Sequence, residues 1–197
     1  MHTADQLIKD KIRSRFEESV ANIHLTGEHL AGKIAQAAEM IVASLSAGGG
    51  LFIFGNGGSA ADAQHIAGEL VGRFLAERQA LRAEALSTDT SVLTCVANDY
   101  DYASIFSRQL EGKARGGDVA LALSTSGNSP NILAALTAAR KIGMKTIALT
   151  GSGGGQCALL ADILLDVPYK GKAPRIQEAH TVIYHVLCEL VEAAFVK

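Results

Sequence analysis

The sequence predicts an α/β fold built on a doubly wound, mostly parallel sheet. Short apolar runs at 51–54 and 118–123 have the composition of strands that are buried in a parallel sheet. Each run is followed by a short polar loop that contains glycine and serine, and then by a stretch with helical periodicity. Strands and helices that alternate through short connections place helices on both faces of one sheet.

The chain before the first strand is predicted to form two helices within residues 3 to about 46. Thr3 and Gln6 have the spacing of a capping box, and apolar residues then recur at helical intervals. A second amphipathic stretch continues to the three glycines at 48–50. Two long helices exceed what a small sheet needs, so we expect one of them to pack against another subunit.

The rest of the chain is predicted to alternate strands with helices. The expected strands span residues 51–54, 83–86 (the weakest), 118–123, 146–149 and 162–167. The expected helices span residues 60–73, 130–142 and 175–195. No internal repeat or disordered linker divides residues 1–197, so we expect a single domain with a helical oligomerisation segment at 1–46 and an α/β core at 47–197.

Composition narrows the classes of function. The formal net charge is −2 without a block of like charges, so electrostatics favour neither a nucleic acid nor a membrane partner. No apolar run approaches the roughly 20 residues of a membrane span. The amino terminus lacks the pattern of a signal peptide. Cys95, Cys157 and Cys188 are widely spaced and odd in number, which indicates free thiols and a cytoplasmic location.

The loop at 124–129 is predicted to bind phosphate. It places the hydroxyl residues Ser124, Thr125, Ser126 and Ser129 around one glycine, directly before a proline suited to the first helical position. Hydroxyl groups and backbone N–H groups at a helix amino terminus suit a phosphate dianion. The loop has no lysine and no GxxxxGK[ST] spacing, so it is not a nucleotide P-loop. An ordinary polar turn with a serine cap is the alternative.

A second polar loop lies at 55–59 and leads into a helix. Its glycines at 55, 57 and 58 do not have the GxGxxG spacing of dinucleotide sites, and a tight turn is the simpler alternative. The helix that follows carries His65 and Glu69 four residues apart, on one face. Such a pair supplies two metal ligands, or a ligand and a base, but is also common on solvated surfaces. The last helix carries Gln177, His180 and His185. Taken by itself, each histidine fits an ordinary interior or surface position as well as a metal ligand.

Three segments together resemble the sugar isomerase (SIS) family. They are GNGGSAADAQHIAGEL at 55–70, STSGNS at 124–129 and RIQEAH at 175–180. Within this family the resemblance is strongest to the bacterial sedoheptulose 7-phosphate isomerases, also called phosphoheptose isomerases, and it covers nearly the whole chain. It implies a five-stranded parallel sheet, a homotetramer with active sites at subunit interfaces, and one zinc ion per subunit.

The resemblance also implies roles for individual residues. Residues that match substrate contacts are Asn56, Gly57, Gly58, Ser59, Glu69, Asn98, Asp99 and Gln177, with Ser124, Thr125, Ser126 and Ser129 as the phosphate loop. Those that match zinc ligands are His65, Glu69, Gln177 and His185. The implied acid–base residues are Glu69 and His185, with Asp62 and Arg73 in support.

The implied reaction converts sedoheptulose 7-phosphate to D-glycero-D-manno-heptose 7-phosphate, the first step of ADP-heptose precursor synthesis. Glu69 would move a proton between C1 and C2 through an enediol, His185 would shuttle protons among the oxygens, and zinc would polarise the carbonyl. A zinc-bound Glu69 has less freedom to act as a base. Gln177 and His185 are eight residues apart, about 12 Å along one helix, so either Gln177 precedes the regular helix or two subunits form the site.

A relative in the same subfamily gives the main alternative. It is a tetrameric scaffold that binds the replication initiator DnaA and lacks the residues corresponding to Glu69 and His185. Both residues are present here, which favours the isomerase. A different sugar-phosphate isomerase or a sugar-binding regulator is a further alternative. No lysine stands at a strand end to form a Schiff base, which disfavours an aldolase.

Overall fold

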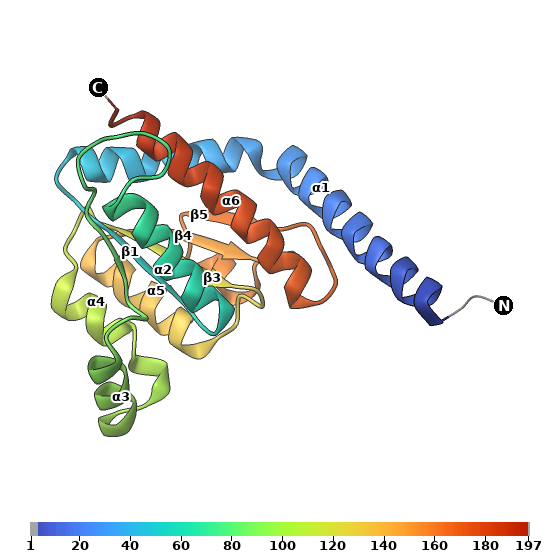
Figure 1. The fold of residues 1–197 in the computed structure, drawn as a ribbon. Coiled ribbons are helices and arrows are strands. Elements are labelled where there is room, and N and C mark those ends of the chain that lie inside the picture. The colour runs from blue at the N-terminus through green and yellow to red at the C-terminus, as the bar shows by residue number, and fades with distance from the viewer. Residues whose placement is uncertain (1–3, 197) are drawn as a thin grey trace.

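The computed structural model describes residues 4–196 and has a parallel sheet with helices on both faces (Figure 1). The strands are β1 (Leu51–Gly55), β2 (Ala83–Ala85), β3 (Val119–Ser124), β4 (Lys145–Thr150) and β5 (Ile163–Asp166). All four strand pairings are parallel, and the order across the sheet is β2-β1-β3-β4-β5. The predicted five-stranded parallel sheet is therefore confirmed.

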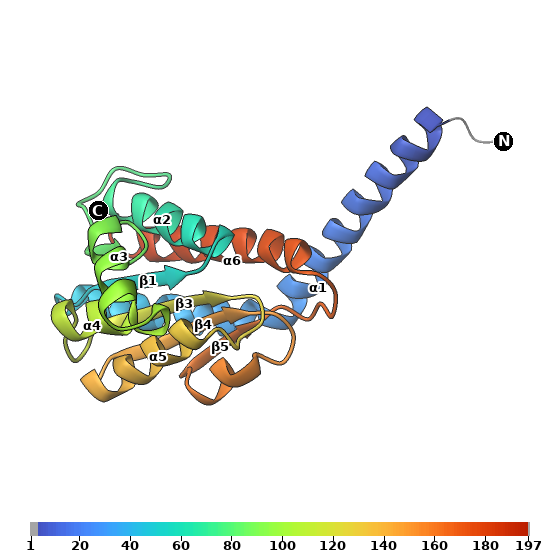
Figure 2. The ribbon, with the colours of Figure 1, turned by 90° about the horizontal axis from the view of Figure 1, so that it is seen from below.

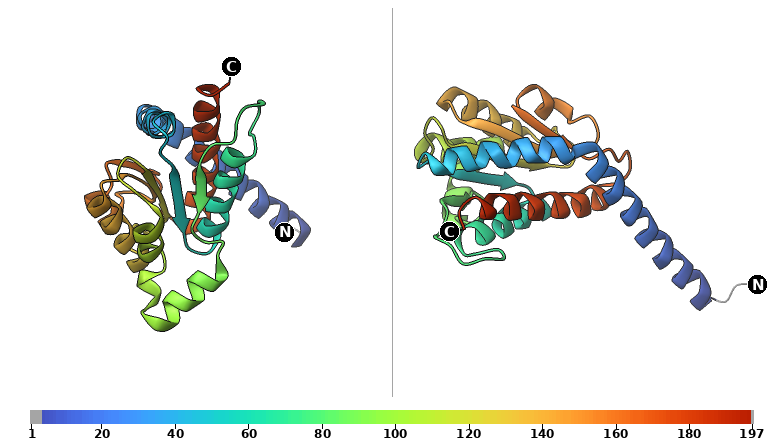
Figure 3. Two further views of the ribbon diagram at one scale, coloured as in Figure 1. Left: turned by 90° about the vertical axis from the view of Figure 1, so that its left-hand side faces the viewer. Right: turned by 90° about the horizontal axis from the view of Figure 1, so that it is seen from above.

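Helices cover the sheet in two layers. The α-helices are α1 (Ala4–Ser46), α2 (Gly58–Val71), α3 (Thr90–Asp99), α4 (Ser107–Lys113), α5 (Pro130–Ile142) and α6 (Ala173–Ala193). Two short 3₁₀ helices span Tyr102–Ser104 and Gly155–Leu159. Figure 3 shows α2 and α6 on one side of the strands and α5 on the other.

The strands bury alternate side chains in two apolar cores, as the pleat of a strand requires. Leu51 and Ile53 of β1 pack in the core that is shared with α1, α2 and α6. Phe52 and Phe54 of the same strand pack in the opposite core, with residues from α4 and α5. Since both faces of the sheet are covered, the central strands β1 and β3 are buried throughout, which is why their sequences were recognisable.

The prediction of two leading helices is wrong, because α1 is one continuous helix of 43 residues. The stretch between the two predicted helices has no proline, and its glycine, Gly27, lies in open space, so no residue there ends the helix. Asn22 and Thr26 interrupt the apolar pattern but are buried; the Asn22 amide N–H and the Thr26 hydroxyl each donate to a backbone carbonyl, whereas Oδ1 of Asn22 has no partner within residues 4–196. The first turns of α1 project away from the sheet (Figure 2). The predicted cap at Thr3 lies outside the described residues.

Two helices between β2 and β3 were not predicted. Asp89 caps α3 by accepting a hydrogen bond from the backbone N–H of Val92 at 3.0 Å. No residue of α3 is fully buried, and its apolar stripe is short: Leu93, Val96 and Ala97 are partly buried against the core that contains Phe54. Asn98 and Asp99 stand at the end of α3, which projects from the sheet and the helices packed on it (Figure 1).

Asp118 joins the amino ends of β1 and β3. Its buried carboxylate accepts hydrogen bonds from the backbone N–H groups of Gly50 and Arg115, and it pairs with Arg82 at 3.0 Å. These contacts lie at the edge of the sheet opposite the loops at 55–59 and 124–129. No helix in residues 4–196 is long and apolar enough to cross a lipid bilayer. All three cysteines are free, with Cys95 exposed.

Candidate functional site

The two predicted substrate loops meet at the point where the strand order reverses. β1 has β2 on one side and β3 on the other, and ligands in open α/β sheets bind beyond the carboxyl ends of the strands at such a point. Asn56, after β1, exchanges two side-chain hydrogen bonds of 2.9 and 2.7 Å with Asn131 of α5. The hydroxyl of Tyr102 also donates to Asn56, at 3.2 Å. The hydrogen bonds between Asn56 and Asn131 hold the loop after β1 against α5, the helix that follows the loop at 124–129.

The loop at 124–129 folds back on its own hydroxyl groups. Ser124 ends β3, and its Oγ accepts a hydrogen bond from the backbone N–H of Gly127 at 3.2 Å and lies 3.4 Å from Oγ of Ser129. Ser129 is the residue before α5, and Pro130 occupies the first turn, as expected. The hydroxyl groups therefore gather at the amino end of a helix of 13 residues, where an anion is favoured.

A second loop, at 151–155, supports the phosphate loop from the side of β4. The backbone N–H of Gly151 donates to the carbonyl of Thr125 at 3.0 Å, and that of Cys157 donates to the carbonyl of Gly127 at 3.0 Å. Gly127 has φ +63°, and a Cβ placed on it would collide with the carbonyl oxygen of Gly154. The close approach of the two loops therefore requires glycine at 127.

The predicted acid–base residues gather between α2 and α6. Nε2 of His65 lies 2.9 Å from Oε1 of Glu69, and the rings of His65 and His185 are 5.1 Å apart between centroids. The hydroxyl of Tyr184 lies 3.1 Å from Nδ1 of His65 and 3.4 Å from the carboxylate of Asp62. Burial raises the pKa of Asp62 above its usual value. The structure thus brings together Glu69, His65 and His185.

Gln177 lies apart from this cluster. It lies inside the regular helix α6, so the predicted alternative in which Gln177 precedes that helix is wrong. Its amide Nε2 lies 2.8 Å from the position that a Cβ on Gly58 would occupy, which places it at the start of α2. Glu69 is eleven residues after Gly58 in the same helix, about 16 Å along the axis. One chain therefore holds the substrate loops and the acid–base residues at separate places.

Asn98 and Asp99 interact with each other rather than with the other predicted residues. The amide of Asn98 donates to Asp99 at 2.9 Å, and the thiol of Cys95 donates to its other oxygen at 3.4 Å. The hydrogen bond from Asn98 and then that from Cys95 lower the pKa of Asp99. Within the described part of the chain neither side chain contacts the phosphate loop or Glu69. Arg73, which was expected to support the site, is exposed just after α2.

Comparison with known proteins identifies the family. The SIS domain model matches residues 15–151, which include both substrate loops. A phosphoheptose isomerase from Rhodospirillum rubrum is 50% identical over 187 residues, which cover 95% of this chain and 98% of the relative. The chain belongs to the phosphoheptose isomerase family.

Two solved structures of the phosphoheptose isomerase family share the fold. Phosphoheptose isomerase GmhA from Neisseria gonorrhoeae has a TM-score of 0.89 at 39% identity, over 94% of this chain and 99% of the other. A phosphoheptose isomerase from Francisella tularensis has a TM-score of 0.90 at 40% identity, over 93% and 97%. The similarity therefore spans α1 and α6 as well as the sheet.

Several residues around the candidate site were not predicted from the sequence. Phe74, just after α2, stacks on the ring of His185 at 5.8 Å between centroids and 29° between planes. Tyr184 joins Asp62 to His65, and Asn131 holds Asn56. Tyr184 could have been predicted, because it is a tyrosine with a hydroxyl group directly before the candidate residue His185 in a predicted helix. Phe74 carried no signal, because its role depends on the packing of two distant segments.

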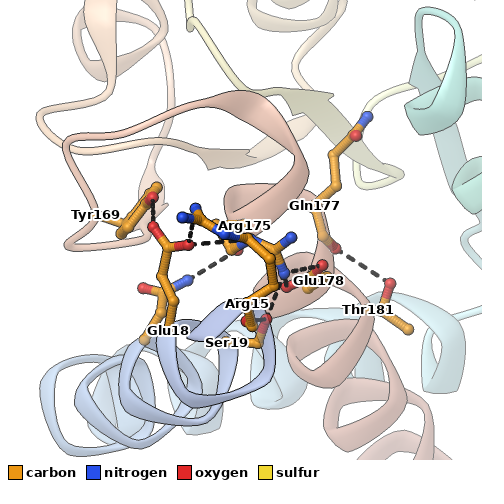
Figure 4. Close-up of polar contacts among 9 residues, drawn as sticks. Arg15, Glu18, Ser19, Tyr169, Arg175, Gln177, Glu178 and Thr181 are labelled. Carbon is orange, nitrogen blue, oxygen red and sulfur yellow. Dashed lines mark hydrogen bonds and ion pairs between the residues drawn. The ribbon is translucent and has the colours of Figure 1, made fainter. Parts of the chain in front are cut away.

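A polar network attaches the first half of α1 to the start of α6 (Figure 4). Glu18 of α1 accepts a hydrogen bond from the hydroxyl of Tyr169 and pairs with Arg175 at 3.7 Å. The hydrogen bond from Tyr169 is the main reason why the pKa of Glu18 is lowered. The side chain of Asn22 donates to the carbonyl of Arg175 at 2.8 Å. These contacts hold the turn of α6 that leads to Gln177.

The buried imidazole of His180 makes stability depend on pH. Its Nε2–H donates to the carbonyl of Thr150 at 3.1 Å, and burial lowers the pKa of His180 to about 4. The unfolded chain, with a histidine pKa near 6.5, therefore binds a proton between pH 6.5 and 4 that the folded chain excludes. We expect the free energy of unfolding to fall by about 3 kcal/mol as pH decreases through this window.

Urea unfolding at pH 7.0, 5.5 and 4.5 measures this effect. His180→Asn keeps an N–H donor but does not titrate, so its stability should decline less than that of the parent protein over the same range. Equal declines in the two proteins would contradict the assignment to His180.

Proposed function

We propose that this protein is an aldose–ketose isomerase that converts sedoheptulose 7-phosphate to D-glycero-D-manno-heptose 7-phosphate. Membership of the phosphoheptose isomerase family supports the substrate class. The observation that carries the chemistry is the cluster of Glu69, His65 and His185: the carboxylate lies 2.9 Å from the imidazole of His65, whose ring in turn lies 5.1 Å from that of His185. The loop at 124–129 would anchor the phosphate, and Asn56 to Ser59 would contact the sugar.

The side chains divide the work of proton transfer. Glu69 removes the proton from C1 of the ketose and returns it to C2, because a carboxylate is a suitable base for an enediol mechanism when it reaches the carbon-bound proton. Its hydrogen bond with His65 fixes the direction in which the carboxylate points. His185 moves protons among the sugar oxygens, since an imidazole has one nitrogen that donates a proton and one that accepts it. Asn98, Asp99 and Gln177 would complete the sugar contacts.

We also propose a homotetramer whose active sites lie between subunits. The separation of about 16 Å between the start of α2 and Glu69 supports this, because one chain does not bring the substrate loops next to the base. The first half of α1 exposes a strip of large apolar side chains at Leu7, Ile8, Ile12, Phe16 and Val20. An apolar groove of about 230 Å³ also runs between α1 and α6. Surfaces of this kind indicate protein contacts.

Zinc, one ion per subunit, is a further part of the proposal, with His65, Glu69, Gln177 and His185 as ligands. Nitrogen and oxygen donors of this kind suit zinc. Among residues 4–196, however, no three His, Cys, Asp or Glu side chains are arranged to hold a metal ion, and Gln177 lies two turns from His185. The four residues do not converge within one chain, and the proton transfers above use side chains alone. The free cysteines agree with the proposed cytoplasmic location.

Turnover of sedoheptulose 7-phosphate tests this function. Purified protein should convert it to the aldoheptose 7-phosphate, which NMR detects through its anomeric proton, with and without added zinc. The scaffold alternative predicts binding without turnover, and the relatives found by comparison give it no support. Absence of product under both conditions would contradict the isomerase proposal.

A further inference from the structure

Arg78 and Glu192 form a buried ion pair close to the proposed acid–base residues. The side chain of Arg78 is fully buried and that of Glu192 is 4% exposed, with 3.3 Å between Nε and Oε1. Removing two charges from water is costly, and such a pair is stable only when further hydrogen bonds satisfy both groups. Glu192 accepts three such hydrogen bonds and the two terminal nitrogens of Arg78 donate four, while Nε of Arg78 has only the ion pair among the residues that the structure describes. All of these contacts involve the segment that follows α2.

Glu192 holds three consecutive backbone N–H groups of this segment. Its carboxylate accepts hydrogen bonds from the backbone N–H groups of Phe74 at 2.8 Å, Leu75 at 2.6 Å and Ala76 at 2.8 Å. Hydrogen bonds to a charged acceptor are stronger than those between neutral groups. The hydrogen bonds from the three N–H groups and the charge of Arg78 lower the pKa of Glu192 against the opposing effect of burial. The carboxylate therefore remains ionised and fixes the path of residues 74–76.

Arg78 holds the carboxyl end of α2 from the other side. Its guanidinium donates to the carbonyl oxygens of Glu69 at 2.7 Å, Leu70 at 2.9 Å and Gly72 at 3.1 Å. The last carbonyls of a helix lack partners within the helix, and here one arginine supplies them. The first of these carbonyls belongs to the proposed base itself. The guanidinium thus fixes the backbone from which the Glu69 side chain extends.

The same segment carries the aromatic ring that contacts the second acid–base residue. Phe74 stacks on His185, and its own backbone N–H is bound by Glu192. Glu192 follows His185 by seven residues, so both side chains project from the same face of α6, about two turns apart. One ion pair therefore controls the backbone of Glu69 and the ring packed against His185.

We propose that Arg78 and Glu192 are positioning residues for the isomerase: they fix the segment after α2 so that Glu69 and His185 keep their mutual arrangement. The inference rests on the proposed function, since it takes these two as the acid–base residues. Neither Arg78 nor Glu192 touches the reacting atoms in this scheme. Their loss disturbs the geometry of the reaction more than the affinity for the substrate.

Glu192→Gln tests the proposal, because glutamine keeps the size of the side chain but loses its charge and one acceptor oxygen. Amide exchange of residues 74–76 should become at least tenfold faster. The imidazole NMR signals of His185 should shift, since they depend on the ring current of Phe74. The kcat should fall at least tenfold while KM changes less than twofold. Unchanged His185 signals together with parental kcat would overturn the proposal.

Asp118→Asn is the matched control. Asp118 is also a buried carboxylate that accepts backbone N–H groups and pairs with an arginine, but it lies at the opposite edge of the sheet. This variant should lose comparable stability and keep its His185 signals and its kcat within twofold. An equal loss of kcat in Asp118→Asn would assign the effect to stability and overturn the proposal.

Phe74→Leu keeps the test decisive if Glu192→Gln does not fold. This variant leaves the ion pair intact and removes the aromatic ring. The His185 signals should therefore shift and kcat should fall. Parental kcat would overturn the proposal. A parent protein without turnover would instead overturn the proposed function. In that case the NMR signals and the amide exchange, which do not depend on activity, would still show whether residues 74–76 position the His185 ring.

Discussion

Replacing Glu69 by glutamine should lower kcat for the heptose phosphate reaction about 10³-fold, the middle of the range for loss of a general base. An amide of the same size cannot remove a carbon-bound proton, yet its oxygen still accepts a hydrogen bond from His65, which lies 2.9 Å from the native carboxylate. The fold and phosphate binding should therefore be retained. Turnover by NMR and thermal unfolding measure the two effects separately.

Glu28→Gln provides a control with the same chemistry at another place. His24 and Glu28 of α1 are also four residues apart and 3.4 Å from each other, but both are exposed. This variant should retain kcat within twofold. Parental activity in Glu69→Gln, or an equal loss in Glu28→Gln, would remove Glu69 from the mechanism.

Gly127→Ala should cost about 2–4 kcal/mol of stability and raise KM for the sugar phosphate at least tenfold. The left-handed conformation at φ +63° is unfavourable for alanine, and the added methyl group would collide with the carbonyl of Gly154. Relief of this collision separates the phosphate loop from the loop at 151–155. Urea unfolding and steady-state kinetics on sedoheptulose 7-phosphate measure the two consequences.

Gly153→Ala separates backbone strain from the collision. Gly153 has φ +81°, but no atom lies within 4 Å of the added Cβ. This variant should lose about 1–2 kcal/mol, with KM unchanged, because only the conformational penalty applies. Equal KM values for Gly127→Ala and the parent would show that the packing of the two loops does not shape the phosphate site.

The strands and the position of the loop at 124–129 were predictable because their signals are local. Buried parallel strands are apolar throughout, and all five strands were found close to their observed bounds. Helix α1 was divided wrongly: Asn22 and Thr26 are polar but buried, and the Asn22 amide N–H and the Thr26 hydroxyl donate to a distant and a local carbonyl, so the helix continues through them. Helix α3 was missed although Leu93, Val96 and Ala97 have helical spacing, because the helix has only 10 residues and none of them is fully buried.

The site was predictable where motifs name the residues and unpredictable where packing does. His65 and Glu69 could be paired from their spacing, and the structure joins them with His185 across two helices. Phe74 and Glu192 are separated by 118 residues, and no local pattern relates them. The spacing of Gln177 and His185 predicted a separation of about 12 Å on one helix, and the unbroken α6 keeps both residues on that helix.

The deuterium content of the aldose made in deuterium oxide tests proton transfer by Glu69 most directly. The Glu69 side chain is 23% exposed, so a proton taken from C1 has access to exchange with solvent before it reaches C2. The predicted result is aldoheptose 7-phosphate with deuterium at C2, seen by NMR as loss of the C2 proton signal. Absence of aldose, or aldose with only protium at C2 as a hydride shift would give, would contradict it.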